Sequence, residues 1–171
     1  MDIIREIQIA QMDVNIVFEQ LMKKIQQYEK TTGTKVHTID EIVEEYESVY
    51  PLTSNTAVFK GKKPTGVFLK KGIRSNVGTW KKVFELILKD CASNSAKRVS
   101  LLNLRGKVSG RERVFLSDRP DNMRSPLKIV DDLFVESHYD TESLLRILTN
   151  RLLKPVGYDY TNIEIAIRNS S

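Results

Sequence analysis

The chain has 171 residues, of which 40% are hydrophobic and 29% charged, and it carries a formal net charge of +5 at pH 7. This composition is typical of a globular protein and excludes the low hydrophobicity that keeps a chain disordered. No window approaches the roughly 18 consecutive apolar residues of a transmembrane helix, and the single cysteine, Cys91, excludes an internal disulfide.

Charged residues near the N-terminus, among them Asp2, Arg5 and Glu6, interrupt the apolar stretch that a signal peptide needs. We therefore expect a soluble, cytoplasmic protein. The charge changes sign along the chain: residues 1–56 hold five Lys and Arg against ten Asp and Glu, and residues 57–171 hold 22 against 12. A basic segment of this kind is typical of proteins that bind polyanions, although a basic surface can also be idle.

Residues 1–30 predict one long helix, because no glycine or proline interrupts them and apolar residues alternate steps of three and four. Ile9, Met12 and Ile16 near the opposite face favour burial among several helices, in a higher oligomer or against a second helix of the chain. The steps form a heptad seam of Ile4, Ile7, Gln11, Val14, Phe18, Leu21, Ile25 and Tyr28. Such a seam predicts a homodimer or higher oligomer, with the polar Gln11 setting the register. The alternative is an ordinary bundle helix within one chain.

A second, short acidic helix is predicted after Gly33, which is placed to cap the first helix. Thr38 and Glu41 have the spacing of a capping box, and Pro51 closes the helix. Its apolar face comprises Ile39, Ile42, Val43, Tyr46 and Val49. The predicted organisation is a helical oligomerisation region over 1–50, a linker over 51–64 and a basic α+β domain over 65–171.

Short strands and helices alternate in the predicted domain. Residues 66–77 indicate an extended pair around Gly72, one helix begins at Thr79 and another at Thr141. A helix or turn covers 96–104, and strands are predicted at 113–117, 133–137 and 162–168. The inward-facing residues of the two helices are Trp80, Val83, Phe84, Ile87, Leu88 and Cys91, and Leu144, Leu145, Leu148 and Leu152.

The fold class that these elements predict is α+β. A long, coiled-coil-like N-terminal helix precedes a small, mostly antiparallel sheet, with helices packed on one face of the sheet.

The richest basic segment places seven cations on loops around a strand: Arg105, Lys107, Arg111, Arg113, Arg119, Arg124 and Lys128. Arg and Lys on loops can approach phosphates, and nearby glycines permit close main-chain contact. Lys81 and Lys82, on the outer face of the helix that begins at Thr79, extend the predicted nucleic-acid-binding surface. Arg111 and Arg113 are predicted to share the outer face of their strand, with Val114 and Leu116 over the core.

No catalytic motif is present in the sequence. The GxxxxGK[ST] order of a nucleotide-binding loop is missing, and His37 and His138 have no partner at ligand or triad spacing. Phe68, Phe115 and Tyr139 are candidates for base stacking, but their strand-like runs favour core packing. Five acids would suit a metal-dependent nuclease, but their surroundings favour turns: Asp118, Asp121, Asp131, Asp132 and Glu136. We therefore predict no catalytic residue, no metal and no cofactor.

Residues 64–167 resemble a poorly characterised group of small prokaryotic domains that accompany restriction, defence or mobile-element proteins. The matching pieces are KPTGVFL, GTWKKVFELILKDC, GRERVFLSDRPDNMRSPLKI, LFVESHYDTESLLRILTNRLL and GYDYTNIEIAI. The resemblance does not include the long N-terminal helix. It implies a DNA-related role and assigns no catalytic residue.

These patterns predict an oligomeric, non-catalytic accessory or regulatory protein that binds nucleic acid, DNA in preference to RNA, and no membrane. The alternative is a protein-interaction or regulatory module whose basic residues bind an acidic partner protein. A phosphodiester-cleaving enzyme is the least supported class, because the acids form no coherent ligand set.

Overall fold

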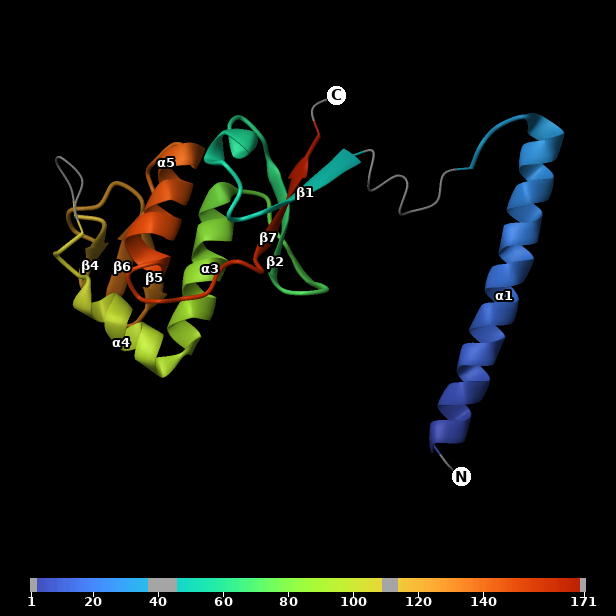
Figure 1. Cartoon of the computed structure of the whole chain (residues 1–171), viewed down its shortest axis with the longest axis horizontal. Coiled ribbons are helices and arrows are strands. Elements are labelled where there is room, and N and C mark those ends of the chain that lie inside the picture. The colour runs from blue at the N-terminus through green and yellow to red at the C-terminus, as the bar shows by residue number, and fades with distance from the viewer. Residues whose placement is uncertain (1–2, 37–45, 109–113, 170–171) are drawn as a thin grey trace. The chain divides into compact units, whose positions relative to one another are not determined.

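The computed structural model describes residues 3–36, 46–108 and 114–169, with the backbone alone for residues 4–10. The chain divides into two compact units, Met1–Val43 and Glu44–Ser171 (Figure 1). Over the described residues, the first unit contains one long helix and the second combines helices with antiparallel strands. The predicted α+β class is therefore confirmed.

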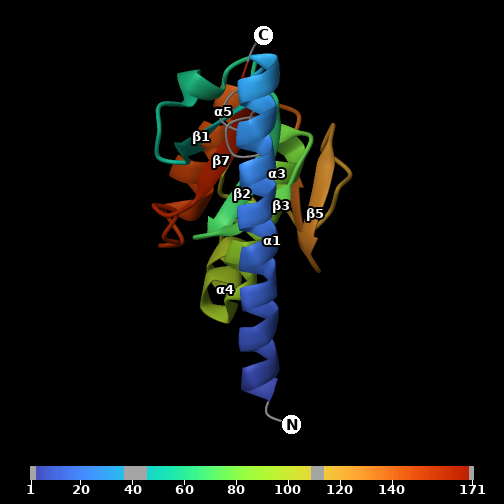
Figure 2. The same ribbon diagram turned by 90° about the vertical axis from the view of Figure 1, so that its right-hand side faces the viewer.

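The first unit contains α1, Ile3–Thr32, which runs without a break over 30 residues (Figure 2). At the standard rise its length is about 45 Å. Gly33 follows in the left-handed conformation at φ 67°, and its N–H donates to the Glu29 carbonyl at 2.9 Å. This is the glycine cap that the sequence predicts. Among the helices described, none is both long enough and apolar enough to span a membrane.

Over its described residues, the second unit contains two sheets where the sequence predicts one. The first sheet has four strands in the order β1-β7-β2-β3, namely β1 Glu47–Pro51, β7 Glu164–Arg168, β2 Pro64–Lys70 and β3 Ile73–Asn76. The second has three strands in the order β4-β6-β5, namely β4 Leu116–Ser117, β6 Leu133–Glu136 and β5 Pro126–Val130. Neighbouring strands in both sheets pair antiparallel.

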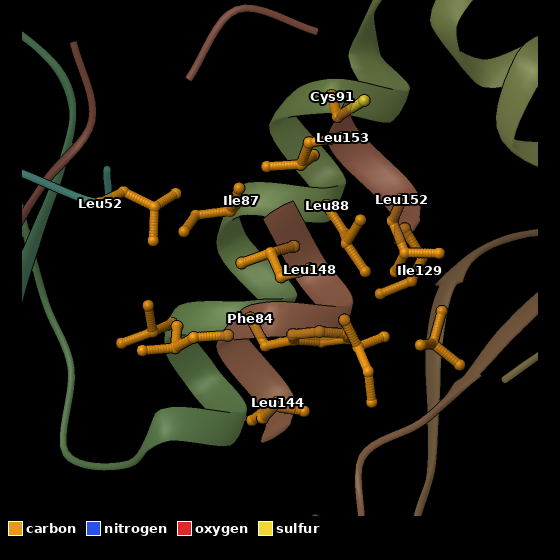
Figure 3. Packing of buried hydrophobic residues seen from close by; sticks show 14 of the residues in the cluster. Leu52, Phe84, Ile87, Leu88, Cys91, Ile129, Leu144, Leu148, Leu152 and Leu153 are labelled. Carbon is orange, nitrogen blue, oxygen red and sulfur yellow. The ribbon is translucent and has the colours of Figure 1, made fainter. Parts of the chain in front are cut away.

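Two helices lie between the sheets. One is α3, Trp80–Ser93, which contacts β2 of the first sheet and β5 of the second. The other is α5, Thr141–Arg146, which continues as the π-helical segment η2, Ile147–Leu153. Figure 3 shows the leucines of α5 and η2 packed against α3, with Leu52 to one side of α3 and Ile129 to the other. The helix α4, Ser95–Asn103, follows α3, and the 3-10 turn η1, Thr56–Phe59, follows β1.

The apolar stripe of α3 is buried as predicted, and the side chains of Val83, Phe84 and Ile87 are inaccessible to solvent. Cys91 of the same stripe is also inaccessible, and burial raises the pKa of its thiol to about 11. The predicted inward face of the later helix is likewise buried: Leu144, Leu145, Leu148 and Leu152.

Side-chain caps determine where these helices begin. The Thr79 hydroxyl accepts from the Lys82 N–H at 3.2 Å, and α3 starts where the sequence predicts. The helix α5 begins at Thr141, as the sequence predicts, and its cap is Asp140. Its carboxylate accepts from the Ser143 N–H at 2.9 Å, and the hydrogen bonds from Ser143 lower the pKa of Asp140. A charged acceptor at this position also complements the positive end of the helix dipole.

The prediction of a helix that ends at Pro51 is wrong over the residues that the structure describes. Its start, including the capping box, falls within residues 37–45, which lie outside the described residues. Glu47–Pro51 form β1, which pairs with β7 so that Val49 lies opposite Ala166. The strand forms despite helix-like apolar spacing, because β1 supplies backbone hydrogen-bond partners along one edge of β7.

The stretch predicted as a linker, 51–64, belongs to the second unit, which begins at Glu44. Leu52 is 2% exposed, Phe59 is inaccessible, and both belong to the core. Phe59 also packs edge-on against Trp80, with ring centroids 5.4 Å apart. The predicted boundary therefore lies too late in the chain, because these apolar side chains fill core space beneath the first sheet.

The strand predicted at 113–117 is shorter than expected, and the sequence prediction missed β5. Leu116 is inaccessible as predicted, but Val114 is 37% exposed. Phe115 is only 5% exposed and packs against Tyr139, with ring centroids 5.3 Å apart. The prediction that Val114 lies over the core is therefore wrong, because the larger aromatic ring next to it occupies that position.

A polar clasp crosses the outer face of the first sheet, from Arg74 on β3 to Glu47 on β1. The Arg74 guanidinium donates to both carboxylate oxygens, at 2.7 and 3.0 Å, and its Nε donates to Asn76 Oδ1 at 3.0 Å. The hydrogen bonds from Arg74 lower the pKa of Glu47. The clasp passes so close over Gly66 on β2 that an added Cβ would lie 2.8 Å from Arg74 Nε.

Gly66→Ala should therefore displace Arg74, and its effect should depend on the clasp. In the wild-type background we expect a loss of stability, whereas in an Arg74→Ala background the change should be neutral or favourable, because alanine suits a strand better than glycine. The coupling free energy between the two positions should be about 1 kcal/mol. Urea denaturation of the four proteins measures it, and equal effects of Gly66→Ala in both backgrounds would disprove the contact.

Candidate nucleic-acid interface

The second sheet positions the segment 105–128, from which most of the predicted nucleic-acid-binding residues come. Strand register places Leu116, Val135 and Leu127 side by side, and all three are buried on the inner face. The next row has the opposite orientation and comprises Ser117 on β4, Phe134 on β6 and Lys128 on β5. The outer face of this sheet therefore combines a hydroxyl, an aromatic ring and a cation.

A buried carboxylate, that of Glu136 at the end of β6, fixes the loop that leads into β5. It is inaccessible to solvent and accepts backbone N–H groups from Arg124 at 2.6 Å, Ser125 at 3.0 Å and His138 at 2.8 Å. Burial raises the pKa of Glu136, but the backbone hydrogen bonds outweigh burial and lower its pKa overall. The carboxylate is thus ionised in the folded protein and holds the backbone beside Arg124 in one conformation.

The first group of cations lies around Ser125, at the start of β5. The Ser125 carbonyl accepts from the Ser137 hydroxyl at 2.7 Å and from the Ser137 N–H at 3.0 Å. Its hydroxyl accepts from Lys81 Nζ at 2.9 Å. Lys81 from α3 and Arg124 from the loop, which are far apart in the sequence, are therefore brought together at the start of β5.

A second group of cations lies at the other end of β5, around the turn to β6. Arg105 Nη1 donates to the Asp132 carbonyl at 2.8 Å, and its Nε donates to the Leu102 carbonyl at 2.9 Å. Lys128 Nζ lies 3.0 Å from the Asp131 carboxylate, and this contact lowers the pKa of Asp131. Both partners of the Lys128–Asp131 pair are exposed, so the pair contributes little to stability.

The predicted cations are therefore not gathered at one point. Ser125 and Asp131 mark two groups that lie about 20 Å apart along the strand direction. Lys107 and Arg119 are exposed on loops, whereas Lys82 is engaged by Glu85 at 2.9 Å. Arg111 and Arg113, together with their predicted shared face, lie outside the described residues.

Phe115 and Tyr139, two of the three candidates for base stacking, pack in or against the core, which is the role that their strand-like runs favoured. The third, Phe68, is half-buried on the outer face of the first sheet, where the Arg74 guanidinium lies 6.0 Å from its ring centroid. Phe134 was missed by sequence reasoning. The alternation of Leu133, Phe134 and Val135 could have revealed it, because the two buried aliphatic residues assign the ring between them to the opposite face.

The acids considered for a metal site serve other purposes in the described structure. Glu136 binds backbone N–H groups, Asp131 pairs with Lys128, and Asp118 accepts from the Ser117 hydroxyl at 3.3 Å. Over the described ranges, no group of three or more His, Cys, Asp or Glu side chains is placed to hold a metal ion. The histidine His37 lies outside the described ranges.

The predicted oligomerisation seam of α1 is exposed in the single chain. Exposed fractions are 66% for Val14, 60% for Phe18, and 52% for both Leu21 and Tyr28. Gln11 is also exposed and Ile25 is partly so, whereas Ile4 and Ile7 belong to the segment with backbone alone. The apolar residues outside the seam are exposed as well: Met12, Ile16 and Val17. An exposed apolar face of this extent is typical of an interaction surface.

No family model, no curated protein and no solved structure was found to match the chain.

Glu136→Gln should destabilise the second unit by about 2–3 kcal/mol at pH 7, because an amide cannot accept from all of the backbone N–H groups that the carboxylate binds. The pKa of Glu136 is lower in the folded protein than the unfolded value of about 4.3. Its contribution is therefore present above that pH and is lost as the pH falls through the folded pKa.

The difference in stability between wild type and Glu136→Gln should accordingly narrow below about pH 4. Urea denaturation from pH 7 to pH 3 measures the difference, with Glu164→Gln as a control at an exposed carboxylate. A Glu136→Gln protein as stable as wild type at pH 7 would contradict this role.

Proposed function

We propose that this protein is an oligomeric, non-catalytic accessory protein that binds nucleic acid, DNA in preference to RNA. The loops around the second sheet bind phosphates, and α1 joins copies of the chain. The observation that carries the proposal is the contact of Lys81 with Ser125, which directly follows Arg124 on a loop held by the buried Glu136. The charge of the unit Glu44–Ser171 supports it, since 22 Lys and Arg stand against 15 Asp and Glu.

A fixed basic loop favours phosphate binding for a thermodynamic reason. Long cationic side chains lose conformational freedom when they bind, and a backbone that is already ordered leaves only that side-chain cost. Arg124 is exposed on this loop, Lys107 and Arg119 are exposed on other loops of the segment 105–128, and all three can donate to phosphate oxygens. Lys128 and Lys82 contribute less, because each already contacts a carboxylate.

Assembly through α1 would strengthen this binding. A heptad seam gains stability only when a second helix covers it, and Phe18 and Leu21 are more than half exposed in the single chain. Each added copy brings another basic surface to the same stretch of nucleic acid, so that binding of the second surface becomes intramolecular. The resemblance of residues 64–167 to domains that accompany restriction or mobile-element proteins favours DNA as the ligand.

A second candidate function is a protein-interaction module for an acidic partner. The first sheet favours it, because Val49 is 48% exposed on its outer face and Ile73, on the edge strand β3, is 62% exposed. Exposed aliphatic groups beside cations suit a protein surface better than a phosphate backbone. Direct binding measurements distinguish the two functions.

The phosphate-binding loops predict a steep salt dependence. Fluorescence anisotropy should show binding of labelled DNA at low salt, with affinity falling as salt rises. The combined change Lys107→Gln, Arg119→Gln and Arg124→Gln should weaken binding and lower the slope of log affinity against log salt by roughly 2–3.

The matched control removes three cations elsewhere: Lys70→Gln, Lys71→Gln and Lys154→Gln. This protein has the same net charge as the loop variant and should keep nearly wild-type affinity. Failure of the wild-type protein to bind DNA or RNA at low salt would refute the proposed function and favour the acidic partner.

The seam of α1 predicts the oligomeric state. In multi-angle light scattering the full chain should have the mass of a dimer or a larger assembly, and Phe18→Glu with Leu21→Glu should give a monomer, because two carboxylates cannot be buried in the seam. Gln20→Glu with Gln27→Glu adds the same charge outside the seam and should leave the mass unchanged. A monomeric wild-type chain would contradict assembly through α1.

A further inference from the structure

Phe134 occupies an unusual place among the aromatic residues of the second unit. Most of the others lie in the core or pack against it: Tyr50, Phe59, Trp80, Phe84, Phe115, Tyr139, Tyr158 and Tyr160. Phe134 stands on the middle strand of the second sheet, between Leu133 at 1% and Val135 at 0% exposure. Its two neighbours face the core, so its ring faces outward and remains half-buried.

Phe68 on the first sheet is its closest counterpart, also half-buried and also outside the core. The two differ in what lies over the ring. The Arg74 guanidinium lies over Phe68. Within the part of the chain that the structure describes, no aromatic ring or cation stacks on Phe134. Among the residues that the structure describes, Phe134 thus presents an aromatic surface that no other ring or cation covers.

The surroundings of Phe134 suit a ligand that carries both rings and negative charge. Lys128 lies beside it on β5 and Ser117 lies beside it on β4, in one row across the sheet. Lys81 and Arg124 lie on one side of this row, toward the start of β5, and Arg105 lies on the other side, toward the turn between β5 and β6. An aromatic ring at the centre of a small sheet, with cations at both ends, is the arrangement on which bases stack while phosphates contact the cations.

We propose that the outer face of the second sheet binds single-stranded nucleic acid by stacking a base on Phe134. The inference rests on the proposed nucleic-acid binding and specifies its ligand. Bases within a duplex are stacked on each other and expose only their edges, so Phe134 can reach a base face only in a single strand. Stacking tolerates any base, because every base has a π-face, and no strong sequence preference is expected.

The test compares Phe134→Leu with Phe68→Leu in the full chain. Leucine keeps an apolar side chain at each position and removes the aromatic face. The probes are fluorescein-labelled oligothymidylate and oligouridylate of about 20 nucleotides, which cover the site size of small single-strand binders, and a DNA duplex of the same length. Anisotropy is measured at low and moderate salt.

We expect wild type to bind both single strands more tightly than the duplex. Phe134→Leu should weaken single-strand binding about tenfold, with little change in the salt dependence or in duplex binding. Phe68→Leu should leave all three affinities unchanged. Wild type that binds the duplex as tightly as the single strands, or Phe134→Leu with unchanged single-strand affinity, overturns the inference while the proposed function stands. Wild type that binds none of the probes overturns both.

Ultraviolet cross-linking of wild-type protein to oligothymidylate, followed by mass spectrometry, tests the same contact without a substitution. A cross-link on Phe134 supports the inference even if Phe134→Leu fails to fold. Cross-links confined to peptides outside β4, β5 and β6 overturn it.

Discussion

Burial of α3 on two sides is the constraint on which the second unit depends. Ile87 faces the side of the first sheet, whereas Phe84 and Leu88 extend the apolar surface toward β5 and η2 (Figure 3). Each of these side chains is at most 1% exposed, and full burial of such a residue contributes roughly 1.5–3 kcal/mol. A helix that is apolar over so wide an arc is stable only when both flanks are covered, which requires one sheet on each side.

This constraint links the core to the proposed interface. β5 carries Lys128 on its outer face while Leu127 and Ile129 are buried on its inner face. The same short strand therefore anchors the second sheet to the helix layer and presents a cation to solvent. Glu136 extends the connection into the adjoining loop, because a buried carboxylate must retain its backbone donors or lose its stabilisation. The buried Glu136 thus fixes the exposed loop that carries Arg124.

Local patterns predicted the parts of the fold that local physics determines. The stripe of α3, the start of α3 at Thr79 and the turn at Gly72 follow from spacing and residue type, and the structure confirms them. β1 was predicted as a helix because its pairing partner, β7, lies more than a hundred residues away and leaves no trace in the nearby sequence. β5 was missed because its five residues, which begin with Pro126, carry too short a pattern for a strand to be recognised.

The sequence predicted many of the residues of the candidate site, but not how they are arranged in space. The number of cations marks the basic segment in the sequence, yet only the fold brings Lys81 to Ser125, beside Arg124, and separates both cations from Arg105. Glu136 could not be identified as a structural carboxylate, because its donors are backbone groups that every sequence contains. Its side chain accepts hydrogen bonds from main-chain N–H groups, and no sequence motif identifies a residue in this role.

The burial of Cys91 has a practical consequence for studying this protein in solution. It is the only cysteine in the chain, it is inaccessible, and at neutral pH its thiol is almost entirely protonated, because its pKa is raised to about 11. Maleimide reagents attack the thiolate and should therefore leave the native protein unmodified. A cysteine introduced at any exposed position becomes the one reactive handle, so a spin label or fluorophore can be attached at a chosen point without first removing a native residue.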